Sequence, residues 1–595
     1  MVVVGAASLA VNKTIVLSHS AKADFENQGS GVPNYLGAAT ISPDGTQAWV
    51  PSKQDNIRRG VLRNGAQLNF QNTVRAISSR IDLGSQVEDY AARLDHDNSG
   101  VASAVAFDPQ GVYMFVALET SREVAIVDAH GRWEMFRVPV GRAPQGLALS
   151  ADGLRLYVNN FMERTVTVLN LSPLLVDGQS SVPVLATLLP VGSERLSAQV
   201  LLGKQLFYDA ADTRLARDAY ISCAACHNDG GQDGRVWDLT GFGEGLRNTI
   251  ALRGRAGGQG FLHWSNNFDE VQDFEGQIRT LAGGSGLMTD AAFNAGTRSQ
   301  PLGDAKAGQS ANLDALAAYV ASLNAFAPSP LRNQDNTLTA DAVAGQSLFR
   351  TKNCAACHSG TAFTSSNGNN PSNVGTLKPA SGQRLGGALT GIDVPTLRDA
   401  WATAPFLHDG SAATLADAIR AHTNVAVTDA ELPQLTAYVQ QIGSEEPSAP
   451  TQIGTGLTGS YYNGMALSGT PLLTRVEAIN FDWGSNAPAA GVPKDKFSVR
   501  WSGRVQVPTS GLYRFQTVSD DGVRLSVNGV QVINSWTNHA ARTDTSADVN
   551  LTAGQFYTVS MEYYENGGKA VARLRWRQPG TTTYVAVPAD KLYAN

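Results

Sequence analysis

The sequence predicts a multidomain chain with an N-terminal all-β repeat region, a mostly α-helical duplicated region and a C-terminal all-β region. The length of 595 residues is enough for about four domains of roughly 150 residues. Apolar residues make up 43% and charged residues only 16%, which excludes a largely disordered chain. Near residues 190 and 450 the sequence changes from alternating strands to helical segments with Gly-rich loops, and then back to strands and turns.

Charge and hydropathy exclude two classes of partner. The chain has 46 Lys and Arg against 52 Asp and Glu, a formal net charge of −6, and no long basic run. We therefore expect no nucleic acid partner and no anionic membrane surface. No apolar run approaches the roughly 18 residues of a spanning helix, so we expect no membrane span.

Residues 1–190 repeat a turn phrase that is followed by an alternating strand. The phrase ends at Gly45, Gly111 and Gly153. The last two glycines are 42 residues apart, the period of a propeller blade, and the first interval of 66 predicts an insertion around residues 57–97. These repeats resemble bacterial β-propeller repeats of the surface-layer type. About three to four blades are too few to close a ring, so we expect a partial β-propeller, completed by another chain or by upstream sequence.

The four cysteines form two identical pentapeptides, Cys223-Ala-Ala-Cys226-His227 and Cys354-Ala-Ala-Cys357-His358. Cys-x-x-Cys-His is the attachment motif of c-type haem, in which two thiols bond the haem vinyl groups and the histidine ligates the iron. The alternatives are a disulfide redox pair or a four-cysteine zinc site, but zinc pairs usually lie about 15–20 residues apart and these lie 131 apart. We therefore predict two covalently bound haem c groups and no disulfide.

Covalent haem attachment also predicts the compartment, because it takes place outside the bacterial cytoplasm. We expect a periplasmic or extracellular, cell-surface location. The start Met1-Val-Val-Val-Gly5 lacks the positive segment of a signal peptide, so we expect the export signal to lie upstream.

The phrase Gly-x-x-Leu-Phe precedes each haem motif, at residues 203–207 and 345–349, which predicts a duplicated cytochrome c region. We place its first domain at 195–330 and its second at 335–447, joined by the Pro-containing stretch 325–330. A second linker at 444–450 leads to an all-β sandwich at 455–595.

Further motifs follow each haem motif in a fixed order. The first is followed by Arg247-Asn-Thr249 and Trp264, and the second by Pro395-Thr-Leu-Arg-Asp399 and Thr403-Ala-Pro-Phe-Leu-His-Asp-Gly410. This order resembles the bacterial dihaem cytochrome c peroxidase superfamily, which includes the enzyme that matures the quinone cofactor of methylamine dehydrogenase. The resemblance implies a reactive first haem, at His227, and a second haem that feeds or stores electrons.

The resemblance also implies a calcium ion and a tryptophan between the haems. On the matching motifs, Asn248, Thr403 and Pro405 surround the calcium, and Trp264 lies on the inter-haem path. Ordinary core packing is the alternative for Trp264.

The remaining iron ligands follow by elimination. No histidine lies between His227 and Asn248, where activatable relatives carry a displaceable sixth ligand, so we expect an open position at the first haem. No methionine lies in residues 331–447, and His422 stands where the second haem's methionine falls in the family. We predict His358 and His422 as the ligands of the second haem, with His408 as the rival to His422.

The acid and base groups for peroxide cleavage are open. The family's glutamate, about twenty residues after the tryptophan, has no counterpart in residues 280–288. We name His263 and Glu275 as the candidate catalytic residues beside His227 and Trp264, with Glu270 and Asp273 as further candidates. Surface solvation is the alternative for the acids.

Six motifs run through the C-terminal region, at residues 456–462, 499–503, 511–515, 519–522, 525–529 and 572–576. They resemble the β-sandwich of anthrax protective antigen, which also occurs in adhesins and glycosidases. In carbohydrate-binding members, adjacent aspartates hold a calcium ion that binds sugar hydroxyls, and here these are Asp520 and Asp521. The alternative is that Asp-Asp-Gly forms only a tight turn.

Three functions share these features. The leading hypothesis is a dihaem peroxidase-type oxidoreductase that takes hydrogen peroxide or another small oxidant, with a small redox protein as electron donor or acceptor. The second is a non-catalytic electron-transfer cytochrome that the sandwich anchors to carbohydrate on a polysaccharide or cell surface. The third is an oxidase of a protein or organic substrate, with the propeller as its docking platform.

Overall fold

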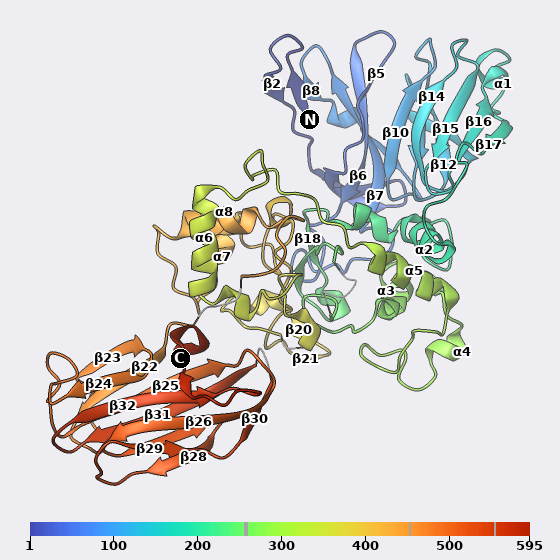
Figure 1. Ribbon diagram of the computed structural model, residues 1–595. Coiled ribbons are helices and arrows are strands. Elements are labelled where there is room, and N and C mark those ends of the chain that lie inside the picture. Colours follow the sequence, from blue (N-terminus) through green and yellow to red (C-terminus); the bar gives the residue numbers. More distant parts are fainter. Residues whose placement is uncertain (255–259, 370, 451–453, 553–554, 595) are drawn as a thin grey trace. The chain divides into compact units, whose positions relative to one another are not determined.

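The computed structural model describes residues 1–254, 260–369, 371–450, 454–552 and 555–594 (Figure 1). The predicted ranges 195–330, 335–447 and 455–595 therefore each include residues outside this description. The chain divides into two compact units, residues 1–450 and residues 451–595. None of the helices in the described ranges has the length and apolar character needed to cross a bilayer.

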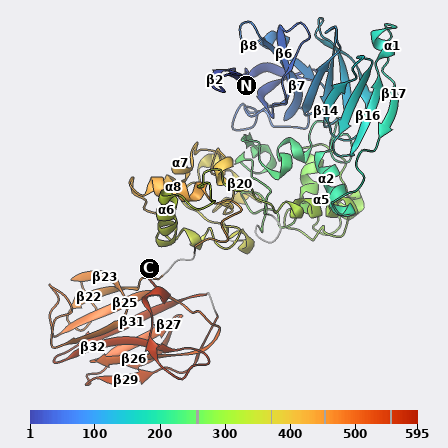
Figure 2. The ribbon, with the colours of Figure 1, turned by 45° about the horizontal axis from the view of Figure 1, so that its top comes forward.

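Residues 1–190 form a short hairpin and three antiparallel sheets (Figures 1 and 2). The first sheet has the order β3-β4-β6-β7-β8, with β5 and β9 paired to it, and the other two are four-stranded meanders, β10 to β13 and β14 to β17. The strands are β1 (Val2–Val4), β2 (Val11–Thr14), β3 (Ser20–Phe25), β4 (Gln28–Asn34), β5 (Thr40–Ile41), β6 (Gln47–Asp55), β7 (Val74–Asp82), β8 (Val87–Glu88), β9 (Leu94–His96), β10 (Ala102–Phe107), β11 (Tyr113–Leu118), β12 (Glu123–Asp128), β13 (Trp133–Pro139), β14 (Pro144–Leu149), β15 (Arg155–Asn160), β16 (Thr165–Asn170) and β17 (Val184–Leu188), with α1 (Ser172–Leu175) before the last.

The repeated turn phrase has one structural role in all three sheets. It connects β5 to β6, β10 to β11 and β14 to β15, in each case closed by a hydrogen bond from the glycine N–H to the carbonyl three residues earlier. Gly45, Gly111 and Gly153 have φ of 70°, 72° and 73°, a conformation that favours glycine. The repeat seen in the sequence is therefore a repeat of sheet and turn.

The predicted insertion at 57–97 is wrong in its extent. This range contains β7, whose residues are mostly buried and pair along the full length of β6. The inserted residues are the connection between β6 and β7, and a second short excursion that carries β8 and β9. The polar residues of β7 suggest an exposed segment in the sequence. In the structure several of them are buried by neighbouring elements, so β7 is a strand of the sheet.

The core of this region lies between neighbouring sheets. One cluster joins Trp49 and Ala76 of the first sheet to Val116 of the second, and another joins Phe115 of the second to Leu156 of the third. Successive sheets therefore pack face to face through their apolar side chains.

The region from 195 to 447 contains seven helices among its described residues, with long loops between them. The helices are α2 (Ala198–Tyr208), α3 (Glu275–Thr280), α4 (Asp290–Phe293), α5 (Ala311–Ser322), α6 (Ala340–Thr351), α7 (Leu415–Arg420) and α8 (Leu432–Gln440). Short elements lie between them: η2 (Cys223–Ala225), η3 (Asn228–Gly230), β18 (Val236–Asp238), η4 (Thr240–Phe242), β19 (Leu246–Asn248), η5 (Val271–Phe274), η6 (Cys354–Ala356), η7 (Ser366–Gly368), η8 (Pro379–Ser381), β20 (Gln383–Arg384), β21 (Gly387–Ala388) and η9 (Ala400–Ala402). The prediction of a mostly helical region was too strong, because loops and turns hold most of these residues.

The two halves of this region repeat one helix crossing. In the first, α2 crosses α5 at Gly203, where an added Cβ would lie 1.8 Å from the carbonyl oxygen of Ala315. In the second, α6 crosses α8 at Gly345, and the corresponding distance to the carbonyl of Gln434 is 1.9 Å. Only glycine allows this approach, so the glycine of each Gly-x-x-Leu-Phe phrase fixes the distance between the helices.

The aromatic residue of the same phrase packs in the same way in both halves. Phe207 meets Tyr319 edge-on at 5.1 Å between ring centroids, and Phe349 meets Tyr438 edge-on at 5.4 Å. The haem motif of each half therefore follows the first helix of an equivalent helix pair.

Residues 454–594 form two packed antiparallel sheets (Figure 2). One has the order β23-β22-β25-β31-β27-β28, with β34 paired to β25, and the other β24-β32-β26-β29, with β30 and β33 at its sides. The strands are β22 (Leu457–Asn463), β23 (Leu473–Glu477), β24 (Asn480–Gly484), β25 (Phe497–Gln506), β26 (Gly511–Asp520), β27 (Val523–Val527), β28 (Val530–Ser535), β29 (Arg542–Thr545), β30 (Val549–Leu551), β31 (Phe556–Glu565), β32 (Ala570–Arg577), β33 (Val585–Ala586) and β34 (Leu592–Ala594), with η10 (Ala589–Lys591). Alternate residues of β25 and β32, among them Trp501 and Trp576, fill the core between the sheets.

Candidate functional sites

The second Cys-Ala-Ala-Cys-His motif borders a cavity of about 420 Å³. Cys354, Cys357 and His358 all line it, because the short turn η6 brings the two cysteines to one wall. Most of the remaining wall is apolar, including Phe349, Val394, Leu397, Leu415, Ile419, Val425, Leu435 and Val439. Two thiols, an imidazole and apolar walls around one cavity are the donor set and the surroundings that a covalent haem requires.

His358 and His422 line this same cavity. The Nδ1 atom of His358 faces the carbonyl of Phe363 at 3.3 Å, and that of His422 faces the carbonyl of Ala418 at 2.8 Å. Donation from Nδ1 to a carbonyl fixes the tautomer in which Nε2 is the ligand atom, as in most histidines that bind metals. Burial, with a smaller contribution from His422, lowers the pKa of His358 to about 4, so the imidazole is neutral at physiological pH.

His408, the rival ligand, lies elsewhere. It is fully buried and is not among the residues that line the cavity. Its Nε2, the atom that would have to bind iron, lies 2.7 Å from the hydroxyl of Ser381, and its carbonyl accepts the N–H of Asn248 at 2.6 Å. The geometry therefore favours His422 over His408.

The first motif has the same local structure. Ser222 accepts the N–H of Ala225 and starts the turn η2, and the Nδ1 atom of His227 faces the carbonyl of Gly231 at 3.4 Å. Cys223 packs against the core between α2 and α5, whereas Cys226 packs in a second cluster that includes Val74 and Val101 of the β region. The first site is therefore built from two parts of the chain.

The two alternatives to haem attachment fit the cysteines less well. Burial raises the pKa of the Cys223 and Cys354 thiols to about 11, opposite to the lowered pKa of a redox-active pair. Among the described residues, the one group of three or more close metal-ligating side chains contains no cysteine, so the two pairs do not converge on a zinc ion.

Trp264, Asn248, Thr403 and Pro405 all line the cavity beside the second haem motif. Trp264 is buried, and its Nε1 donates to the carbonyl of Asn248 at 2.8 Å. The side-chain amide of Asn248 donates to the carbonyl of Pro405 at 2.5 Å, and its Oδ1 is buried without a hydrogen-bond partner. An unpaired buried oxygen beside a carbonyl is suited to a hard cation.

The three candidate acids are tied into local structure. Glu275 is fully buried and accepts Arg279 at 2.8 Å and the N–H groups of Leu287 and Met288. Glu270 accepts the N–H groups of Lys306 and Ala307, and Asp273 pairs with the Lys306 ammonium. Glu275 thus anchors the loop that follows α3, and the structure does not support it as a proton donor.

His263 has a different environment. Its Nδ1 lies 2.7 Å from the side-chain oxygen of Asn267, and its Nε2 lies 3.3 Å from the amide of Gln277. Glu244 lies 3.9 Å away, and the imidazole is 19% exposed. Of the four candidates, His263 and Glu270 keep partial access to solvent, whereas Asp273 and Glu275 are buried.

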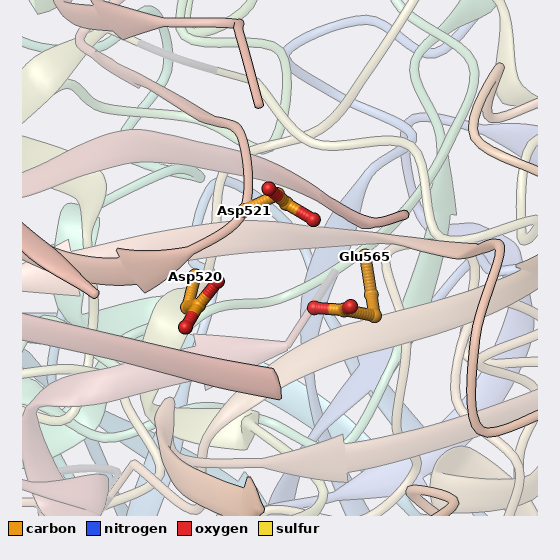
Figure 3. A group of neighbouring side chains, drawn as sticks. All are labelled: Asp520, Asp521 and Glu565. Carbon is orange, nitrogen blue, oxygen red and sulfur yellow. The ribbon is translucent and has the colours of Figure 1, made fainter. Parts of the chain in front are cut away.

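In the C-terminal unit, Asp520 and Asp521 are joined by a third carboxylate, Glu565 (Figure 3). One oxygen of each lies within 4.8 Å of the others. The oxygens of Asp521 accept the N–H groups of His539 and Asn566, both at 2.9 Å, which leaves the carboxylate fixed in place. Glu565 is fully buried, and its Oε1 has no hydrogen-bond partner.

The three carboxylates repel one another. Burial first, and then Asp521, raises the pKa of Glu565 to about 7, and burial and Asp521 also raise the pKa of Asp520. A divalent cation would relieve this repulsion. Sequence reasoning missed Glu565 because it ends β31, more than forty residues after the aspartates, and only the strand register brings it to them.

These features define a c-type cytochrome with two haem-attachment sites, followed by a β-sandwich with a carboxylate cluster. Comparison with known families agrees with this class. Residues 197–345 match the family model "Di-haem cytochrome c peroxidase", residues 342–443 match "Cytochrome c", and residues 454–590 match "PA14 domain". The chain therefore carries a di-haem cytochrome c peroxidase region of the MauG-like kind and a C-terminal PA14 domain.

Three curated relatives are similar to parts of this chain. The anti-sigma-I factor RsgI3 of Acetivibrio thermocellus is 41% identical over 140 residues, which are 24% of this chain and 21% of that protein. Hydrazine synthase subunit gamma of Kuenenia stuttgartiensis is 28% identical over 286 residues, and cytochrome c551 peroxidase of Nitrosomonas europaea is 25% identical over 283. Each of these two matches covers 41% of this chain, and they span 74% and 80% of the relatives.

Proposed function

We propose that this protein is a dihaem oxidoreductase that reduces hydrogen peroxide, or uses it to oxidise a substrate, at the site of His227. One observation carries the proposal: the two motifs differ in what faces them. His422 and His358 line the same cavity beside the second motif. By contrast, the segment between His227 and Asn248 contains no histidine that could be a second ligand to the iron of the first haem. An open position is what a small oxidant needs.

The protein's own groups have separate parts in this reaction. When bound, haem supplies the iron at which the oxidant reacts and the means of storing electrons. His227 would hold the iron of the first haem, and His358 and His422 would hold that of the second. The main-chain carbonyls opposite their Nδ1 atoms fix the tautomer of each. Trp264 carries electrons between the sites, and His263 is the group that we propose moves the proton.

We further propose that Asn248, Thr403 and Pro405 hold a calcium ion beside Trp264. The unpaired buried Oδ1 of Asn248 supports this, and the amide nitrogen of the same side chain donates to the carbonyl of Pro405, which places that carbonyl beside it. Such an ion would keep Asn248 and Trp264 in register, since Trp264 donates to the carbonyl of Asn248.

The test is steady-state turnover of hydrogen peroxide with a reduced small electron-transfer protein, on the full chain with both haems. The account predicts peroxide-dependent oxidation of the donor, slowed in Trp264→Phe and unchanged in Trp133→Phe, a control at an exposed tryptophan of the β region. If the wild type exchanges electrons with the donor but shows no reaction with peroxide, the protein is an electron-transfer cytochrome and the enzymatic proposal is wrong.

A second function is favoured by the carboxylate cluster. We propose that Asp520, Asp521 and Glu565 bind calcium and that the PA14 domain uses it to bind carbohydrate. Calcium titration of the wild type and of Glu565→Gln tests the ion, with Glu477→Gln, a carboxylate at the end of β23, as control. Equal calcium affinity in the wild type and Glu565→Gln would refute the calcium site. Glycan binding that is unchanged when a chelator removes calcium would refute the role of calcium in carbohydrate binding.

We also infer that the three N-terminal sheets are blades of a β-propeller, within the predicted division 1–190, 195–330, 335–447 and 455–595. The repeated turn and the face-to-face cores support this. Since covalent haem attachment takes place outside the cytoplasm, we propose a periplasmic or cell-surface location. Cell fractionation followed by haem staining tests it, and haem-stained chain in the cytoplasmic fraction alone would contradict it.

A further inference from the structure

A group of four charges, three fully buried and one 25% exposed, lies where the N-terminal β region meets the first haem motif. The ammonium of Lys53, in β6, lies 2.8 Å from Oδ1 of Asp55 and 3.5 Å from Oδ2 of Asp233, and all three side chains are fully buried. Arg235 completes the group, with its Nε 3.2 Å from Oδ2 of Asp55. Two residues come from the β region and two from the loop that follows His227.

This group is in electrostatic contact with Cys226. The carboxylate of Asp233 accepts a hydrogen bond from the sulfur of Cys226, and Lys53 and Asp55 both interact with that sulfur through their charges. In the haem-loaded protein the sulfur would be a thioether, which cannot donate this hydrogen bond. The charges of Lys53, Asp55 and Asp233 would still lie near the sulfur that holds the haem. Cys226 is the attachment residue next to the axial ligand His227.

A second contact from the β region holds the main chain of the motif. The hydroxyl of Tyr35 donates to the carbonyl of Cys226 at 3.1 Å, and the Lys53 ammonium lies 4.4 Å from the centre of the Tyr35 ring. Asn34 donates to the carbonyl of Asp233 at 2.9 Å and to Asp55 at 2.7 Å. The β region therefore fixes both ends of the Cys226–Asp233 segment.

Lys53 keeps its charge in this position. Burial alone would lower its pKa, but Asp55 and Asp233 outweigh burial and raise the pKa above the usual value. With Lys53, Arg235, Asp55 and Asp233 ionised, the four formal charges cancel. Removing one of them leaves a single uncompensated charge in a medium of low dielectric constant, where its field acts strongly on nearby groups.

We propose that Lys53 and Asp55 of the β region are positioning residues that set the reduction potential of the first haem, and thus that the β region is part of the first site. The proposal rests on the proposed haem attachment at Cys223, Cys226 and His227. Reduction adds an electron to the haem, so a buried positive charge beside it favours the reduced state and a buried negative charge favours the oxidised state. A buried ion pair as a whole contributes little net free energy of folding, whereas removal of one partner alone destabilises the fold, so the double variant described below is the better-folded comparison.

The experiment is a spectroelectrochemical redox titration of the full chain with both haems, at pH 8. Lys53→Met leaves one negative charge, and we expect the midpoint potential of the first haem to fall. Asp55→Asn, close in shape to the native residue, leaves one positive charge, and the potential should rise. Lys53→Met combined with Asp55→Asn restores neutrality and should return the potential close to the wild-type value.

Two controls are internal to the design. The second haem, followed in the same titration, should not shift in any variant. Lys22→Met removes an ammonium from the same β region, where it pairs with Asp95 at 3.0 Å and is 35% exposed, and it should leave both potentials unchanged.

The opposite signs separate this role from a purely structural one, since disruption of packing has no reason to shift the potential in two directions. If Lys53→Met fails to retain haem, Asp55→Asn alone decides, and an unshifted first haem in that variant overturns the proposal. If the variants shift the midpoint potential in opposite directions but the protein does not turn over peroxide, only the proposed function is wrong. If the protein turns over peroxide but the potentials do not shift in opposite directions, only this inference is wrong.

Discussion

The two haem motifs have the same five residues, yet their surroundings differ. The second motif lies in a cavity whose walls include His422 and, from the other half of the duplication, Asn248 and Trp264. The first motif packs against the N-terminal β region, which contributes Tyr35 and Lys53. The pentapeptide and the helix pair are repeated in both halves, whereas the residues around each motif come from different parts of the chain.

This comparison explains how a duplicated cytochrome can divide its work. A site with two histidines is suited to storing and passing electrons, because neither axial position is open to a substrate. A site with one histidine, surrounded partly by charged residues of the N-terminal β region, is suited to reaction with a small oxidant. The following experiments test that division.

The largest expected effect is the loss of one haem. In Cys354→Ala combined with Cys357→Ala, the second site has no thiol for attachment, and the covalent haem content should fall from two to one per chain. Denaturing mass spectrometry and the pyridine haemochrome assay measure this. Retention of two covalent haems would show that these cysteines are not the attachment residues.

Replacement of the sixth ligand comes next. In His422→Gly the second haem should change from low-spin to high-spin. The described residues that line the cavity include no histidine other than His358 and His422, so no other imidazole can replace the lost ligand. Magnetic circular dichroism follows the change. His408→Gln is the matched control and should keep the low-spin state, and the comparison fails if His408→Gln, rather than His422→Gly, produces the high-spin haem.

The two helix crossings should be equally sensitive. Gly203→Ala and Gly345→Ala place a methyl group within 2 Å of a carbonyl oxygen, and each should lower the free energy of unfolding by about 2–3 kcal/mol. Gly276→Ala, in α3 with nothing within 4 Å of the added Cβ, should stabilise slightly. Denaturant unfolding measures all three, and a tolerated Gly345→Ala would mean that the halves are not equivalent.

The smallest effect concerns the C-terminal unit, which serves as a reference for the haem region. The pKa of Glu565 is raised from 4.5 to about 7, so the folded state holds this proton more tightly than the unfolded state. Without calcium, the stability contributed by the protonated group is therefore lost as pH rises from about 4.5 to 7, and the unfolding temperature of this unit should fall by about 5 °C.

Calcium should reverse that fall, since the ion binds the ionised form. The haem spectra should not change in either buffer. Differential scanning calorimetry with calcium or a chelator, at pH 5 and pH 8, makes the measurement, and a calcium effect of equal size at both values would contradict the assignment of the proton to the cation site.

Much of this account was predictable from local sequence. The haem motifs and the turn glycines each act within a few residues, so a spacing in the sequence becomes a fixed geometry. The Gly-x-x-Leu-Phe phrase is also visible in the sequence, but its glycines pack against Ala315 and Gln434, which lie far away in the chain. The prediction of His422 also comes from the sequence, because the absence of methionine leaves few ligands for the second haem, and His422 lines the cavity beside His358.

What the sequence does not show depends on contacts between residues that are not neighbours in the chain. Glu275 is a candidate acid by sequence, but its ion pair with Arg279 and the N–H groups of residues 287 and 288 hold it within local structure. Glu565 and Lys53 carried no local pattern, because the residues that give them a function lie 44 and 180 positions away in the chain. Strand β7 lies within the predicted insertion because its polar residues suggest an exposed segment, although most of its residues are buried.

Electron paramagnetic resonance of the ferric protein, before and after addition of hydrogen peroxide, tests the central claim most directly. The account predicts one high-spin signal from the haem at His227 and one low-spin signal from the haem between His358 and His422, with peroxide removing the high-spin signal. Two low-spin signals that peroxide leaves unchanged would contradict an open first site and, with it, the division of work between the two haems.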